Sequence, residues 1–307
     1  IGLGFDYEFK IFWRNKGFRK VLNLLPARSF DQGMDYVVSL METNLASRMT
    51  EGTVRIFQQA TTLHVVPINL IGVSISTAAF PRLTERLSEN RIDLFKDELR
   101  SVIRAIIWLA LPVAIITYFT RGYVVSFISH RGNSLMAGLL GVFAVAILFR
   151  CLYHILARSF YAQQDTKTPL YISIVAISLN VFLAIWFTFS LRYGAYGLAV
   201  AQAIVAIVEV VILFTMMEMR TPGVLNKYFW QGILRMASAA GFMSIICYFM
   251  VHWLPFEAGA RSLYEAVPKF ILIVLVSLST YLMFSRLLQI KESEPVMRKL
   301  RKVFFRA

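Results

Sequence analysis

Eight long apolar segments constrain this chain more than any other feature of its sequence. Each holds roughly 20 or more predominantly apolar residues, the length at which an α-helix crosses the hydrocarbon core of a bilayer. Lipid offers the backbone no hydrogen-bond partners, so such segments form helices whose hydrogen bonds are internal. The sequence therefore predicts an all-α fold, a polytopic membrane bundle of about eight transmembrane helices. The segments lie at approximately residues 24–47, 54–80, 102–120, 134–161, 169–191, 195–217, 231–254 and 267–289.

Composition and charge support a membrane protein with a defined orientation. Mean hydropathy is +0.61 and charged residues make up 16% of the chain, against about a quarter in soluble proteins. With the start of the chain in the cytoplasm, 24 Lys and Arg residues fall on the cytoplasmic side and 7 on the other. This asymmetry predicts that both ends are cytoplasmic. The net charge of +14 thus reflects topology and contact with membrane lipids, and we expect no nucleic-acid partner.

The connections divide the chain into four predicted parts. A Pro-Gly break between Arg220 and Trp230 separates six apolar segments from a last pair. The chain opens inside an amphipathic stretch, and we expect it to be a piece that lacks its natural start. The predicted parts are a cytoplasmic amphipathic linker at 1–21, a six-helix transmembrane lobe at 22–219, a two-helix unit at 220–290 and a basic cytoplasmic tail at 291–307.

The longest polar connection, residues 81–100, has the pattern of a helix. Leu83, Leu87, Phe95 and Leu99 recur at multiples of four residues and share one face. A polar helix with one apolar face is typical of a helix that lies on a membrane surface. We therefore expect residues 81–100 to lie along the membrane interface.

Charged residues at helical spacing interrupt the first apolar segment. Arg28, Asp31, Asp35 and Glu42 recur at spacings of three, four and seven, which places them on one helix face. Ionisable groups at membrane depth are costly and tend to line polar pathways. Four of them on one face exceed what helix packing needs, so they predict one wall of a hydrated substrate cavity.

A second polar stripe follows in the next segment. Its members are Arg55, Gln58, Gln59, Thr62 and Asn69. Its first four members extend the predicted cavity lining. Pro67 removes a backbone hydrogen bond from the same helix and is followed by Asn69 and Gly72. These three residues predict either a gating position or a static kink.

Other polar residues inside the segments have a simpler interpretation. They are Arg150, His154, Arg158, Asn180, Gln202 and Glu209. Buried polar groups of membrane helices commonly bond to one another across helix pairs, and we favour this interpretation for Asn180 and Gln202. Cys151 and Cys247 lie in different segments. We expect both to be small core residues and not a disulfide pair.

No enzymatic motif accompanies these stripes. The sequence contains no Walker A glycine loop, no HExxH, no CxxC pair and no nucleophile elbow. The four histidines lie in separate segments without metal-ligand spacing. We therefore expect a protein that is not an enzyme, has no cofactor and does not hydrolyse ATP within this chain.

Two stretches, residues 45–85 and 156–170, carry more specific motifs. The matching elements are Ala46-Ser47, Glu51-Gly52, Ala60, Pro67, Gly72, Phe80-Pro81, Arg158, Tyr161-Ala162, Asp165 and Thr168-Pro169. Together these elements resemble the MurJ/MviN family of lipid II flippases, within the superfamily of multidrug and polysaccharide exporters. The eight segments and their spacing also fit the last eight of that family's fourteen helices.

The resemblance implies a bacterial plasma-membrane transporter made of two six-helix lobes around a central cavity. This chain is similar to the second lobe together with two C-terminal helices that form a groove for a polyprenyl tail. The implied substrate is an undecaprenyl-pyrophosphate-linked peptidoglycan precursor, moved to the outer leaflet by alternating access. Membrane lipids are expected partners of the basic tail, and cell-wall synthesis proteins are the partners of a scaffold.

The chain departs from the family pattern at three positions. Thr62 and Val65 stand where family members often carry an arginine and an acid, which removes a cation suited to a diphosphate. Glu42 and Asn180 match two ligands of a sodium site known in some members, whereas Ala184 replaces the third. The coupling ion that these positions leave open is sodium or a proton, with the membrane potential as a driving force.

These observations leave one leading hypothesis and two alternatives. The leading hypothesis is a flippase for lipid II. The first alternative keeps the fold and changes the cargo to another polyprenyl-linked glycan or a cationic drug. The second is a non-transporting membrane scaffold for cell-wall synthesis.

Overall fold

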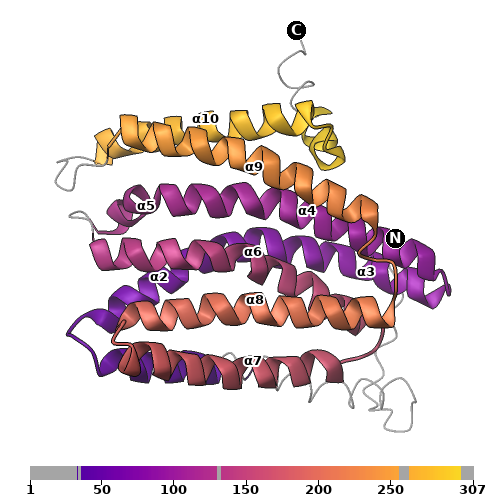
Figure 1. Cartoon of the computed structure of the whole chain (residues 1–307), viewed down its shortest axis with the longest axis horizontal. Coiled ribbons are helices and arrows are strands. Elements are labelled where there is room, and N and C mark those ends of the chain that lie inside the picture. Colours follow the sequence, from indigo (N-terminus) through magenta and orange to yellow (C-terminus); the bar gives the residue numbers. More distant parts are fainter. Residues whose placement is uncertain (1–32, 34–35, 130–132, 256–262, 299–307) are drawn as a thin grey trace, which may run out of the picture.

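The computed structural model describes residues 33, 36–129, 133–255 and 263–298, and these residues form a bundle of long helices that run nearly side by side (Figure 1). Within these ranges there are helices and no strand. Seven of the helices are long and apolar enough to cross a membrane. The prediction of an all-α polytopic fold is therefore confirmed.

The helices follow the predicted segments closely. The first segment is described from residue 36, as an α-helix at residues 36–47. The second consists of α2 (Thr53–Pro67), the π-helical turn η1 (Ile68–Val73) and α3 (Ser74–Ser88), which run on for 36 residues. The remaining elements are α4 (Ile92–Phe119), α5 (Arg121–Ile128), α6 (Ser134–Ala162), α7 (Lys167–Ile185), the π-helical turn η2 (Trp186–Ser190), α8 (Ala195–Arg220), α9 (Lys227–Trp253), α10 (Leu263–Leu287) and the 3-10 turn η3 (Lys291–Ser293).

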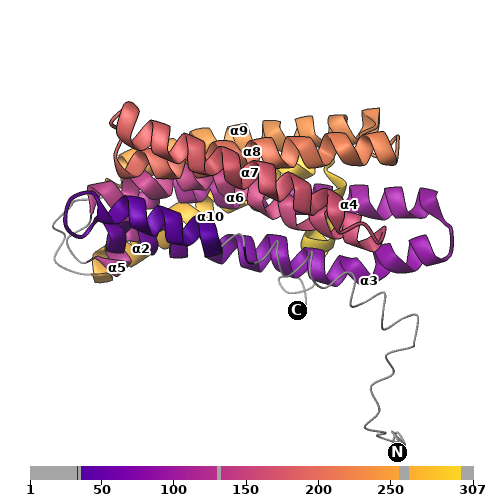
Figure 2. The same ribbon diagram turned by 90° about the horizontal axis from the view of Figure 1, so that it is seen from below.

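α6 lies in the middle of the bundle. It packs against α8 on one side and α4 on the other, while α7 packs outside α8 and the α9–α10 pair packs outside α4 (Figure 1). α6 and α8 each bury 56% of their most apolar stretch, whereas α10 buries 17%. The outer helices therefore keep apolar surface that a bilayer would cover. Figure 2 shows α2 and α3 along one face of this row and α8 and α9 toward the other.

The connections gather at two ends of the bundle. Those at residues 89–91, 163–166 and 221–226 lie together, and we call this the basic end because most lysines and arginines of the described residues are near it. The connections at residues 48–52 and 191–194 lie at the other end, which we call the opposite end. The division of the chain into a lobe and a two-helix unit stays a prediction.

The expectation that residues 81–100 lie along the membrane surface is wrong. α3 and α4 form an antiparallel hairpin, and Leu83, Phe95 and Leu99 are fully buried in it. A helix of 36 residues is roughly 50 Å long at about 1.5 Å per residue, which exceeds the roughly 30 Å hydrocarbon core. An apolar stripe on a polar helix fits another helix as well as it fits a membrane surface, so the pattern alone did not distinguish the two.

The helix changes its winding directly after Pro67, where η1 begins. Arg158 of α6 donates a hydrogen bond from Nη1 to the Val73 carbonyl at 2.7 Å. A Cβ atom on Gly72 would lie 2.7 Å from the Cα atom of Cys151, so η1 and α6 cross at a distance that needs glycine. These contacts hold η1 against α6, and the gating role of Pro67, Asn69 and Gly72 stays a prediction.

Candidate functional site

The two predicted stripes lie in different surroundings. Arg28, Asp31 and Asp35 lie outside the described residues. Glu42 is buried, with 4% of its surface exposed. The second stripe, in contrast, is exposed along most of α2. The structure therefore separates Glu42 from the second stripe, although the helical spacing predicts one cavity for both.

Glu42 belongs to a buried polar core. The Nε2 atom of Gln202 on α8 lies 2.6 Å from both carboxylate oxygens of Glu42 and donates to them. Two turns further along α8, Glu209 accepts a hydrogen bond from Nη1 of Arg150 on α6 at 3.4 Å. Buried charges are tolerated when they are paired and hydrogen-bonded. These two contacts join the helix at residues 36–47, α6 and α8, and they confirm that Gln202 bonds across helices.

Aromatic packing closes this core on the side of α2. The ring of His64 on α2 is buried and stacks on Phe143 of α6, with ring centroids 4.5 Å apart and planes 16° from parallel. Phe57, two turns before His64, meets the same Phe143 ring edge-on at 5.8 Å. One face of α2 is therefore fixed against α6, which leaves the other face free of the bundle.

That other face of α2 is polar. Arg55, Gln58 and Thr62 are exposed, as is Asn69 in η1, and Gln59 is half-buried beside them. At about 100° per residue, positions 55, 58, 62 and 69 fall within a narrow arc of one helix. We call Arg55, Gln58, Thr62 and Asn69 the polar face of α2. Polar and charged side chains are costly against lipid at membrane depth, so this face is suited to water or to another part of a protein.

The predicted sodium ligands are only partly matched. Asn180 of α7 is buried, and its Oδ1 atom has no hydrogen-bond partner among the described residues. Both oxygens of Glu42 already accept from Gln202, and the side chain of Ala184 has no oxygen. Within the described ranges, no group of three or more His, Cys, Asp or Glu residues is placed to hold a metal ion.

The motif around Asp165 joins α7 to α8 at the basic end. The Asp165 carboxylate accepts hydrogen bonds from the backbone N–H groups of Lys167 and Thr168, at 3.0 Å each, and from the Thr168 hydroxyl at 2.6 Å. It also pairs with Arg220 at the end of α8. Burial raises the pKa of Asp165, but the bonds from Thr168 and Arg220 outweigh it and bring the pKa to about 2. The motif residues Asp165 and Thr168 therefore hold the start of α7 against the end of α8.

Seven helices long and apolar enough to cross a membrane, one of them with an exposed polar face, define a polytopic membrane protein. The solved structure of a lipid II flippase MurJ in an inward closed conformation matches with a TM-score of 0.68 and 20% identity, over 93% of this chain and 57% of that chain. The outward-facing structure of a multidrug resistance transporter of the MATE family matches with a TM-score of 0.58 and 11% identity, over 95% and 70% of the two chains.

Sequence comparisons identify the family within this class. The family model described as "Lipid II flippase MurJ" matches residues 2–267. A probable lipid II flippase MurJ of Thermotoga maritima is 23% identical over 92% of this chain and 56% of its own length. The corresponding protein of Haemophilus influenzae is 29% identical over 66% of this chain and 41% of its own length. The chain belongs to the lipid II flippase MurJ family, and it spans about half the length of these relatives.

Proposed function

We propose that the protein to which this chain belongs is a flippase that moves lipid II from the cytoplasmic to the outer leaflet of a bacterial plasma membrane. Membership of the MurJ family supports this cargo. The observation that carries the transport path is the polar face of α2, which is exposed in a membrane-crossing helix. In this proposal the chain supplies one lobe, and the polar face lines a path between this lobe and a second one.

The polar face offers chemistry that suits a lipid-linked glycan diphosphate. Arg55 can bind a diphosphate through charge-assisted hydrogen bonds. Gln58 and Thr62 provide amide and hydroxyl groups for sugar hydroxyls. The polyprenyl tail remains in lipid, along the α9–α10 pair. The headgroup thus crosses beside hydrated side chains without covalent chemistry, as one lobe rocks against the other.

The proposal includes an orientation. The basic end is cytoplasmic, because 24 of the Lys and Arg residues then lie on the cytoplasmic side and 7 on the other. The polar face begins near the opposite end, since Arg55 lies in the first turn of α2. Arg55 therefore lies on the side where the headgroup would leave the path.

The coupling ion in this proposal is a proton, with sodium as the alternative. A sodium ion needs several oxygen ligands. At Glu42 it would have to displace the Gln202 amide, which already bonds to both carboxylate oxygens. Transport by the full-length protein should therefore persist when choline replaces sodium. Loss of transport in choline would make sodium the coupling ion.

Rescue of a bacterium depleted of its own lipid II flippase tests the function. The full-length protein should restore growth, and the double variant Arg55→Ala, Gln58→Ala should not. The matched control is Arg286→Ala, which removes an exposed arginine from the end of α10 and should rescue as well as the unaltered protein. All variants need equal amounts of protein in the membrane.

The alternatives give different results in the same experiment. Rescue by the double variant would favour a scaffold, because a scaffold does not need the polar face. Failure of the unaltered protein to rescue, together with export of a cationic dye, would favour a drug exporter. Failure to rescue with accumulation of another polyprenyl-linked glycan in the cells would change the cargo and keep the fold.

A further inference from the structure

Two neighbouring cavities lie near the opposite end of the bundle and share the residues Tyr118 and Arg121. The first has a volume of about 400 Å³ and lies over α6, between α8 and the junction of α4 with α5. The second has a volume of about 730 Å³ and extends from that junction to the end of α9. Because they share one wall, we treat them as a single cleft, the α8–α9 cleft.

The α8–α9 cleft lies away from the polar face of α2. Its floor includes Val142 and Val145 of α6, whereas Phe143 between them points to His64 of α2. Figure 2 likewise shows α8 and α9 toward the face of the bundle that α2 and α3 do not occupy. In a bundle that crosses the membrane, a surface on this side meets lipid. The cleft is therefore separate from the path proposed for the headgroup of lipid II.

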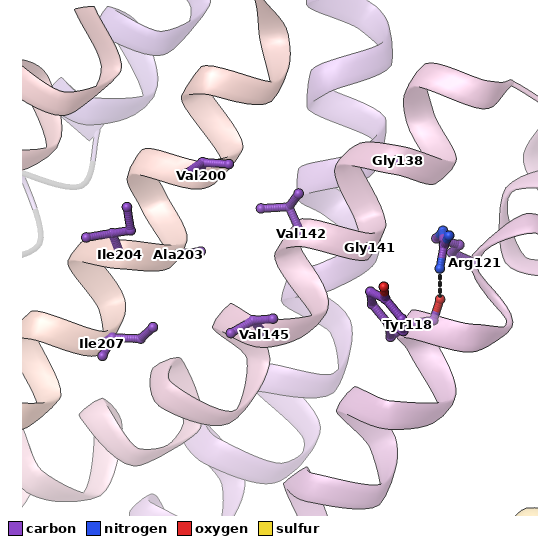
Figure 3. Close-up of a pocket in the computed structure, with 10 residues that line it drawn as sticks. All are labelled: Tyr118, Arg121, Gly138, Gly141, Val142, Val145, Val200, Ala203, Ile204 and Ile207. Carbon is purple, nitrogen blue, oxygen red and sulfur yellow. Dashed lines mark hydrogen bonds between the residues drawn. The ribbon is translucent and has the colours of Figure 1, made fainter. Parts of the chain in front are cut away.

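The first cavity is apolar apart from one charged side chain. Eight of its ten lining residues are glycine, alanine, valine or isoleucine, and none is acidic. Figure 3 shows Val142 and Val145 of α6 facing Val200 and Ile204 of α8, with Arg121 at the far side. Gly141 keeps the floor low, since a Cβ there would lie 3.0 Å from Cδ of Arg121. An acyl chain fits such a surface, and a polar molecule does not.

Arg121 supplies a cation at the wall that both cavities share. Its Nη1 donates to the Tyr118 carbonyl at 2.6 Å, and its Cζ lies 4.8 Å from the centre of the Tyr118 ring (Figure 3). It forms no ion pair with another described residue. A guanidinium has five N–H donors, so most of them remain available to an anion. The positive charge and the apolar floor together suit an anionic amphiphile.

Exposed aromatic residues place this cleft at the level of lipid headgroups. Tyr118, Tyr248 and Trp253 are exposed around it, with Trp253 86% exposed. Tyr193 and Tyr196 are exposed at the neighbouring start of α8. Tyrosine and tryptophan concentrate where the bilayer meets water, which is also where lipid phosphates lie. Arg121 therefore lies at the level of the lipid phosphates, where its positive charge can bind them.

We propose that the α8–α9 cleft binds a phospholipid of the bilayer, with its phosphate on Arg121 and an acyl chain along α6 and α8. The lipid fills the cleft from the membrane and does not cross with the substrate. Anionic phosphatidylglycerol binds better than zwitterionic phosphatidylcholine, since Arg121 faces no carboxylate in the cleft. The bound lipid packs against α8, α6 and the α4–α5 junction. It stabilises their packing at the opposite end, where few charged contacts join the helices.

Native mass spectrometry of the full-length protein, freed of lipid in mild detergent, tests the proposal. Added phosphatidylglycerol should bind at one site of the unaltered protein about tenfold more tightly than at the same site of Arg121→Gln, the effect of one charge-assisted hydrogen bond. Val145→Trp should also lose this site, because its side chain would fill the cleft. The control Arg286→Gln should bind as the unaltered protein does.

Further arms of the experiment separate the sources of the anion. Equal occupancy in Arg121→Gln and the unaltered protein would overturn the proposal. Displacement of phosphatidylglycerol by millimolar inorganic phosphate would overturn the lipid assignment and leave a free-anion site. Loss of transport in Arg121→Gln with unchanged phosphatidylglycerol binding would instead place Arg121 on the substrate path. Retained lipid binding in the Arg55→Ala, Gln58→Ala variant keeps this proposal independent of the proposed function.

Discussion

The two ends of the bundle are held together by different forces. At the basic end, charged groups join the helices: Arg104 of α4 meets Glu292 of η3 with Nε and Oε1 2.7 Å apart, and both side chains are largely buried. Glu218 accepts from the backbone N–H groups of Gly223 and Leu225, at 2.6 and 3.0 Å. Among the described residues, the opposite end has no ion pair.

The opposite end depends on close packing and on single hydrogen bonds. Gly197 of α8 touches the backbone of η2 at Thr188, and the Tyr123 hydroxyl donates to the carbonyl of Leu254. The α8–α9 cleft and the first turns of the polar face also lie at this end. The contacts that stabilise the bundle and the surfaces of the candidate function are therefore separated along its length. The basic end fixes the helices, and the opposite end carries the surfaces for which we propose ligands.

Breaking the buried ion pair at the basic end should have the largest effect on stability. Glu292→Ala leaves Arg104 without its partner in a largely buried place, which costs about 3 kcal/mol. The measurement is the thermal unfolding temperature of the purified protein in detergent. The matched control is Glu294→Ala, which removes an exposed contact of 3.9 Å to Arg298 and should cost less than about 1 kcal/mol. Equal losses in the two variants would remove the contrast between the ends.

A methyl group at Gly197 should be the most damaging small change at the opposite end. Its Cβ would lie 2.7 Å from the backbone nitrogen of Thr188, and relief of this clash requires movement of η2, at a cost of about 1–3 kcal/mol. High salt should leave this cost unchanged, because no charge is involved. Gly241→Ala, with nothing within 4 Å of the added atom, is the control and should be neutral or slightly stabilising. A salt-dependent loss would contradict the account.

Asp165→Asn should cause the smallest loss and the one most sensitive to pH. The variant keeps an acceptor for the start of α7 and loses the charge that Arg220 meets, at a cost of about 1 kcal/mol near neutral pH. The pKa of Asp165 falls from 3.8 to about 2 on folding. The contribution of the carboxylate is therefore complete above the unfolded value and lost as the pH falls toward the folded one.

The difference in unfolding temperature between the unaltered protein and Asp165→Asn should thus be constant from about pH 5 to pH 7 and shrink below about pH 4. A difference that grew with acidification would show that Asp165 destabilises the fold. A difference that stayed constant to pH 3 would show that the carboxylate has no favourable partner in the folded protein.

Much of the fold could be predicted from the sequence, because the cost of exposing backbone to lipid dictates helices of a known length. Hydropathy placed the segments at 134–161 and 195–217 within a few residues of α6 and α8. The hairpin of α3 and α4 was misjudged, since amphipathic periodicity does not name the surface that covers the apolar face. α5 was missed because eight residues are too few to give a membrane-segment signal.

Less of the candidate site could be predicted from the sequence. The helical spacing of Glu42 and Asp35 marked them as unusual, but Glu42 meets Gln202 from 160 positions away, and no local pattern encodes such a pair. The stripe of α2 was correctly placed on one face, because a fixed rotation per residue determines it. The α8–α9 cleft could not be predicted from the sequence. It forms because Arg121 packs beside α6 and because Gly138 and Gly141 have no side chains. Only the packed bundle shows that these residues meet.

We expect the polar face of α2 to line a hydrated path, and accessibility of this face to water tests that expectation. Single cysteines at Gln58 and Thr62, and at the exposed apolar residues Val175 and Phe182 of the outer helix α7, test it in the full-length protein in cells. Cys151 and Cys247 are buried and are replaced by alanine in the background. A charged, water-soluble thiol reagent should modify Gln58→Cys and Thr62→Cys much faster than Val175→Cys and Phe182→Cys. Equal and slow modification at all four positions would place the polar face in lipid or dry protein and contradict the account.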